Sequence, residues 1–272
     1  MAGFNFSSGY GRSRAYSRPG FKSRGYARQR PRAGTRPLYM GSMARRKFVP
    51  RTAGWIQAGE MKHYDAELPA TAIPASTNWT GTEFPPTVSD SGSDDAIFSP
   101  DSGGGSTQRL GKKCTVYKIK IKGLINVPAQ ANQTAADNGT AVRVALVQDT
   151  QTNGAQAQGE SIFKAPTTVT ALQALTSFQD KNFFGRFKVL KDKTFHIQPP
   201  NKSYDGTNIE VGGCIIPFKW NITFKKPVVV NLQTGQGSLS SIVDNGWTVY
   251  ANCTDTGLAP TLTYSSRVSF KG

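Results

Sequence analysis

The chain has 272 residues, and its 33 Lys and Arg against 17 Asp and Glu give a formal net charge of +16. No apolar run approaches the roughly 18 residues of a membrane-spanning helix, and the N-terminus lacks the apolar core of a secretory signal peptide, so we expect neither. Cys114, Cys214 and Cys253 lack C-x-x-C spacing, which indicates neither a disulfide framework nor a zinc site and favours a reducing compartment.

The positive charge is concentrated at the N-terminus. Residues 1–51 contain 13 basic side chains and no acidic one, whereas the other 221 residues (272 less 51) hold 20 basic groups (33 less 13) and all 17 acidic groups. The 13 are Arg12, Arg14, Arg18, Lys22, Arg24, Arg28, Arg30, Arg32, Arg36, Arg45, Arg46, Lys47 and Arg51. The sequence therefore predicts a cationic arm at 1–51 and a nearly neutral body at 52–272.

The arm has the composition of a nucleic-acid-binding segment. It is poor in aliphatic side chains and rich in Arg, Gly, Ser and Pro, so we expect it to be disordered in isolation. Arginine binds phosphate, and the interleaved aromatic side chains, Tyr16 and Tyr26 among them, can stack on unpaired bases. The 13 basic residues are therefore the candidate nucleic-acid-binding residues, with single strands favoured over duplexes.

Two other interpretations of the arm stay open. A basic segment can be a solvated tail or an organelle-targeting peptide, although Gly, Pro and Tyr suit an amphipathic targeting helix badly. Arg45, Arg46 and Lys47 also form a candidate signal for nuclear import receptors.

The stretch 52–111 is rich in Pro, Thr, Ser, Gly and Asp, and we expect it to be mostly loop. The carboxylates of Asp90, Asp94, Asp95 and Asp101 allow a cation site, but their spacing is not that of an EF-hand, and a solvated loop is the simpler interpretation. The glycines at 103–105 lack the Gly-Lys-Ser/Thr of a phosphate-binding loop.

From residue 112 the pattern becomes that of β-strands. Tyr117, Ile119 and Ile121 alternate with a lysine face of Lys118, Lys120 and Lys122, further candidates for nucleic-acid binding that could equally be a solvated surface. Similar patterns recur at 142–146, 186–197, 219–225, 228–230, 247–251 and 262–270, with one candidate helix at 168–179. About eight strands without alternating helices predict an all-β fold: a single eight-stranded antiparallel jelly-roll sandwich with long loops.

Motifs for catalysis or metal binding do not emerge. His63 and His196 have no metal-ligand spacing and no G-x-S-x-G nucleophile elbow accompanies them, so a structural role for His196 is favoured. We expect no enzyme, no metal and no cofactor. N-x-S/T sequons occur at Asn78, Asn132, Asn138, Asn221 and Asn252 and are the one feature that favours a secreted, lectin-like protein.

Four segments in order resemble capsid proteins of small circular single-stranded DNA viruses, the circovirus-like group. They are NFFGRFKVLKDKTF at 182–195, FKKPVVV at 224–230, IVDNGWTV at 242–249 and PTLTYSSRVSF at 260–270, preceded by an arginine-rich arm that is similar to the arms of that family. The resemblance implies a jelly-roll subunit, a T=1 icosahedral shell of sixty copies, and packaging of a single-stranded DNA genome, or of RNA in recombinant particles. It also implies location in the virion, with assembly in the host nucleus. The alternative is a non-capsid nucleic-acid-binding protein with a β-sandwich domain.

Overall fold

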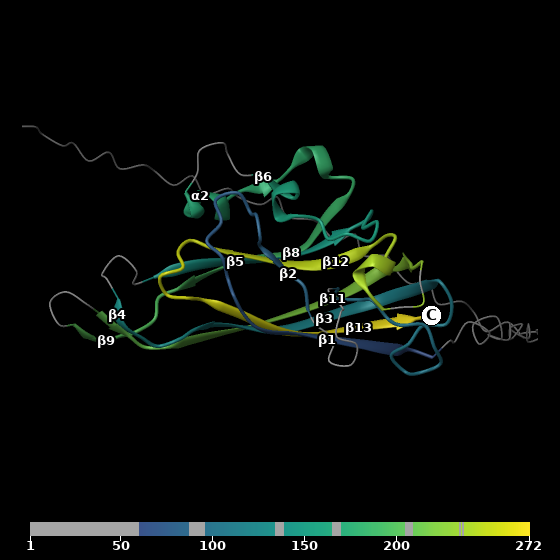
Figure 1. Cartoon of the computed structure of the whole chain (residues 1–272), viewed down its shortest axis with the longest axis horizontal. Helices are drawn as coiled ribbons and strands as arrows, with labels where there is room; N and C mark the ends of the chain where they lie inside the picture. The colour runs from purple at the N-terminus through teal and green to yellow at the C-terminus, as the bar shows by residue number, and fades with distance from the viewer. Residues whose placement is uncertain are drawn as a thin grey trace, which may run out of the picture. The chain divides into compact units, whose positions relative to one another are not determined.

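The computed structural model describes residues 60–86, 96–133, 139–164, 170–204, 209–233, 235 and 237–272. Among these residues, two four-stranded antiparallel sheets form the two layers of the body (Figure 1). The first sheet has the order β1 (Lys62–Ala72), β13 (Thr261–Lys271), β3 (Lys113–Val127) and β11 (Cys214–Asn231). The second has the order β2 (Glu83–Phe84), β12 (Gly246–Cys253), β5 (Thr140–Asp149) and β8 (Phe187–Ile197).

Shorter elements occupy the connections. A three-stranded sheet is formed by β4 (Gln130–Gln133), β10 (Ile209–Val211) and β9 (Asn201–Tyr204), and β6 (Phe163–Lys164) pairs with β7 (Phe178–Gln179). The helical turns are α2 (Ala171–Leu175), η2 (Gly159–Ser161), η3 (Lys181–Phe183) and η4 (Leu239–Ser241). None of the helices in the described ranges is long and apolar enough to cross a membrane. The predicted all-β class is confirmed, and the layered antiparallel sheets are consistent with a β-sandwich.

The main core lies between the two sheets. Because side chains alternate across a strand, Ile119, Ile121 and Val268 of the first sheet point inward, where they join Val142 and Val249 of the second in one buried cluster. Strands are confirmed at the predicted segments as β3, β5, β8, β11, β12 and β13, but β5 and β12 are buried on both faces instead of alternating between core and solvent. The segments expected at 219–225 and 228–230 are one long strand, β11, with a register shift between Thr223 and Val228.

Strand β1 is a long regular element that the sequence did not predict within the loop-rich stretch 52–111. Its core face includes Tyr64, Ala66 and Leu68, which alternate with exposed His63, Asp65 and Glu67, and the strand pairs with β13. The expected participation of Tyr117 in the core face of β3 is wrong. The ladders of β3 shift register at this residue, which leaves it half-buried beside Lys271 rather than in the core.

The helix expected at 168–179 is only one turn long. It begins after Thr170, whose side chain and that of Gln173 form a capping box, and it ends at Leu175. Of the apolar side chains in this segment, Leu175 is buried, whereas Leu172 is 61% exposed and Phe178 in β7 is 87% exposed, so the segment does not bury one continuous helical face. Residues 165–169 lie outside the described residues.

Gly123 in β3 allows the close approach of an aromatic side chain in the core. A Cβ at this position would overlap the ring of Phe218 and lie 3.0 Å from the Thr263 carbonyl oxygen. We therefore expect Gly123→Ala to lower the free energy of unfolding by about 1–3 kcal/mol, the usual cost of overpacking. Urea denaturation measures the effect, and Gly104→Ala is the matched control because its Cβ meets nothing within 4 Å. Equal midpoints for the two variants would contradict the prediction.

Candidate nucleic-acid interface

All the basic candidates that the structure describes lie on the solvent-facing side of the first sheet. In β3, Ile119 and Ile121 are fully buried, so the intervening Lys120 and the following Lys122 stand exposed on the opposite side, with half-buried Lys118 on the same side. The period-2 alternation of the sequence thus produces one lysine face, as the spacing of the three lysines predicts.

Strand register extends this lysine face into three rows across the sheet. The rows are His63–Ser269–Lys118–Thr223, Asp65–Arg267–Lys120–Asn221 and Glu67–Ser265–Lys122–Lys219, each read from β1 through β13 and β3 to β11. The acidic side chains therefore lie on β1 at one edge, and the lysines lie on β3 and β11. The face is electrostatically polarised, with its cationic side over β3 and β11.

An ion pair joins Arg267 of β13 to Asp65 of β1 on this face. Arg267 donates from Nε to Asp65 Oδ1 over 2.7 Å and from Nη2 to Oδ2 over 2.6 Å. The hydrogen bond with Asp65 raises the pKa of Arg267. Among the described residues there are three ion pairs, and none of them includes Lys118, Lys120 or Lys122. Arg267 is thus neutralised within the chain, whereas the lysines remain available to a ligand.

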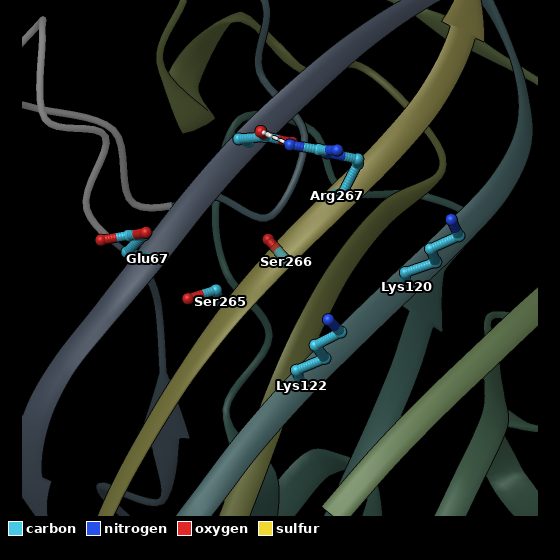
Figure 2. Close-up of a pocket in the computed structure, with 7 residues that line it drawn as sticks. Glu67, Lys120, Lys122, Ser265, Ser266 and Arg267 are labelled. Atoms are coloured by element: carbon cyan, nitrogen blue, oxygen red, sulfur yellow. Dashed lines mark hydrogen bonds and ion pairs between the residues drawn. The ribbon is translucent and has the colours of Figure 1, made fainter.

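A shallow hollow of about 280 Å³ lies over the second and third of these rows, those of Lys120 and Lys122. Figure 2 shows Arg267 reaching across to β1, whereas Lys120 and Lys122 stand on β3 on the other side of Ser265 and Ser266. The Asp65 and Glu67 carboxylates line the β1 side of the hollow, whereas the two ammonium groups and the exposed hydroxyl of Ser265 on the other side suit an anionic ligand such as a phosphodiester. The chemistry available is binding by charge and hydrogen bonds.

Most of the arm and aspartate candidates fall outside the part of the chain that the structure describes. The candidates Arg12, Arg14, Arg18, Lys22, Arg24, Arg28, Arg30, Arg32, Arg36, Arg45, Arg46, Lys47, Arg51, Tyr16 and Tyr26, together with Asp90, Asp94 and Asp95, lie outside the described residues. Asp101 is described, and its carboxylate accepts a hydrogen bond from the backbone N–H of Gly237. Within the described ranges, no group of three His, Cys, Asp or Glu side chains is placed to hold a metal ion.

The two histidines and the sequons are placed in part. His63 Nδ1 lies 3.1 Å from Ser269 Oγ on the neighbouring strand, and His196 lies exposed on β8. Asn252 is fully buried, accepts from the Ser76 N–H and donates to the Ser76 carbonyl oxygen, so its side chain cannot carry a glycan in the folded protein. Its sequon therefore gives the secreted, lectin-like interpretation no support.

The sequence identified the lysine face on β3 but missed the partners that complete it. Lys219 belongs to an alternating segment that was recognisable as a strand, and Asp65 and Arg267 lie about two hundred residues apart. Only the pairing of β1 with β13 and of β3 with β11 brings these side chains into common rows.

Comparison with known proteins gives little further guidance. No protein-family model matches the chain, and no curated protein matches it. Among solved structures, the chain is similar to the one described as the crystal structure of the 60-mer BFDV capsid protein. The identity is 9%, the match covers 78% of this chain and 92% of that chain, and the TM-score is 0.26. A likeness this weak leaves the function to be inferred from the chain's own residues.

Proposed function

We propose that the chain is a viral capsid protein of the circovirus-like kind, that its body is a single jelly roll, and that sixty copies form a small icosahedral shell around circular single-stranded DNA. The observation that carries the proposal is the strand order of the two main sheets. The charged arm and the four ordered sequence segments support it independently.

The strand order is that of a long hairpin rolled up on itself. The adjacent pairs are β5 with β8, β3 with β11, β2 with β12 and β1 with β13. The β5–β8 pair is innermost in the sequence, and each following pair encloses the previous one, with one strand before it and one after it in the chain. This nesting over two sheets supports the proposed jelly roll, an architecture of eight strands in two Greek keys. Capsid domains are a common use of that architecture.

The division of charge supports a division of labour. The 13 basic residues of each arm would bring roughly 780 cationic groups into a shell of sixty copies, enough to neutralise a comparable number of phosphates. The nearly neutral body can pack against copies of itself without strong repulsion. In this proposal the protein resides in the virion, Arg45, Arg46 and Lys47 engage nuclear import receptors of the host, and the role requires no catalysis.

Negative-stain microscopy of the purified full chain tests the proposal. We expect closed particles of uniform size whose absorbance ratio shows packaged nucleic acid. Because arms without a partner repel one another, we also expect assembly to depend on nucleic acid or on salt. A field without closed particles at every salt concentration would contradict a capsid. Nucleic-acid binding without particles would instead favour the non-capsid β-sandwich protein.

A further inference from the structure

The row Glu67–Ser265–Lys122–Lys219 of the lysine face contains an unfavourable pair of like charges. Lys122 of β3 and Lys219 of β11 are direct cross-strand partners, and both are exposed. Two like charges directly opposite each other destabilise a sheet. Neither lysine belongs to an ion pair in the part of the chain that the structure describes. An anion placed between the two ammonium groups would remove this repulsion.

An apolar platform lies next to the lysine pair. The following row places Leu124 of β3 between Thr263 and Pro217, with Leu124 41% exposed and Ile215 of β11, two residues before Pro217, 62% exposed. A hollow of about 610 Å³ covers Leu124, Pro217 and both lysines. It shares Lys122 and Ser265 with the hollow of Figure 2, so the two hollows adjoin at Lys122 and are together called the groove.

The spacing of these groups matches a chain of nucleotides. Lys120 and Lys122 are two residues apart on one strand, a separation of about 6.6–6.8 Å, close to that of successive phosphates in an extended single strand. A base attached to the phosphate at Lys122 can lie against Leu124 and Pro217, which offer an apolar surface of the kind that base faces prefer to water. A duplex would keep its bases stacked inside and could not use this platform.

We propose that this groove of the folded body is a second single-stranded nucleic-acid site, separate from the arm. Lys122 and Lys219 hold one phosphate, Lys120 holds the next, and Leu124 with Pro217 supports a base. The inference rests on the proposed function, because it takes the packaged genome as the ligand. A sulfated polysaccharide has the same charge but no base, so the platform favours the nucleic acid.

Binding of a fluorescent oligothymidylate to the full chain, measured over a salt series, tests the site. We expect Lys122→Gln/Lys219→Gln to weaken binding roughly tenfold and to lower the salt slope by about 0.7, the contribution of one single-strand phosphate contact, because the two lysines hold the same phosphate. The matched control is Lys188→Gln/Lys191→Gln, which removes two exposed lysines from β8 of the other sheet and is expected to change neither quantity. Equal effects of the two double variants would overturn the site.

Lysine acetylation read by mass spectrometry gives a local measurement on the unaltered chain. Oligothymidylate is expected to protect Lys122 and Lys219 and to leave Lys188 and Lys191 reactive. Protection by heparin but not by the oligonucleotide would overturn the proposal in favour of a sulfated polysaccharide. Leu124→Ser is expected to weaken binding of oligothymidylate about threefold and of inorganic polyphosphate not at all, because only the former has bases. Loss of both equally would overturn the platform.

These results separate the groove from the capsid proposal. Protection of Lys122 and Lys219 by the oligonucleotide does not require closed particles. If particles fail to form while the two lysines are protected, the capsid proposal fails and the groove stands. If uniform particles form and the lysines acetylate equally with and without the oligonucleotide, the groove fails and the capsid proposal stands.

Discussion

A chain that lacks residues 1–47 is expected to lose its retention of nucleic acid while its body stays folded. The deletion removes all the arm's basic residues except Arg51, that is 12 of the 33 Lys and Arg of the chain. Each phosphate contact to a single strand contributes about 0.7 to the salt slope, so the slope is expected to fall by up to about 8. Affinity for an oligothymidylate at physiological salt is expected to fall at least ~100-fold, which leaves only the weak contribution of the lysine face.

Two measurements make this deletion decisive. Far-UV circular dichroism should retain the β-sheet spectrum, because the deleted residues precede the first described strand, β1. A full-length variant whose arm arginines are all lysines keeps the charge and loses planar bidentate contacts and stacking. We expect that variant to retain most of the salt slope and to bind more weakly. Unchanged retention of nucleic acid by the shortened chain would show that the arm is not the main binding element.

The sequence predicts a strand correctly where apolar and polar residues that alternate in the sequence also alternate between core and solvent in the structure. In β3, buried Ile119 and Ile121 alternate with lysines, and that alternation is visible in the sequence alone. In β1 the core face is Tyr64, Ala66 and Leu68, of which only the leucine is a strong aliphatic signal. The strand is stabilised by β13, nearly two hundred residues later, and no local pattern contains that information.

The candidate site also depends on strand pairing that the local sequence pattern does not contain. One strand's period places Lys118, Lys120 and Lys122 on one face, but it does not say which residues of other strands stand beside them. A slip of one residue between β3 and β11 would move Lys219 to the core side of the sheet. The like-charge pair with Lys122 and the adjacent apolar platform therefore depend on register, which one sequence does not reveal.

Arg143 is a residue that the sequence pattern gave no reason to select, because it lies within the otherwise apolar run 141–147 of β5. Its side chain is 8% exposed. The guanidinium donates to both carboxylate oxygens of Asp192, at 2.9 and 2.6 Å, and to the carbonyl oxygens of Leu175 and Ser177, each at 2.8 Å. Its central carbon lies 4.8 Å from the ring centroid of Phe163. One side chain thus fastens the end of α2 and the residues before β7 to the second sheet.

Arg143→Met is therefore expected to lower the free energy of unfolding by about 2–3 kcal/mol. Methionine keeps much of the buried volume but supplies no donor, so two carbonyl oxygens lose their partner and Asp192 loses its counter-ion. The 36% exposure of the Asp192 side chain keeps the loss below that of a fully buried pair, because water solvates the remaining carboxylate. Chemical denaturation measures the loss, and hydrogen exchange should quicken in α2 before the sheet opens.

The matched control is Arg267→Met, which breaks a bidentate pair with the same chemistry on the surface. The side chains of Arg267 and Asp65 are 55% and 49% exposed, so water screens the pair, and its loss is expected to shift the denaturation midpoint far less than Arg143→Met does. Similar losses for the two variants would mean that the carbonyl contacts of Arg143 contribute little and that α2 is held mainly by apolar packing. A larger loss for Arg143→Met would show that a single buried cation holds the long connection between β5 and β8 on the body.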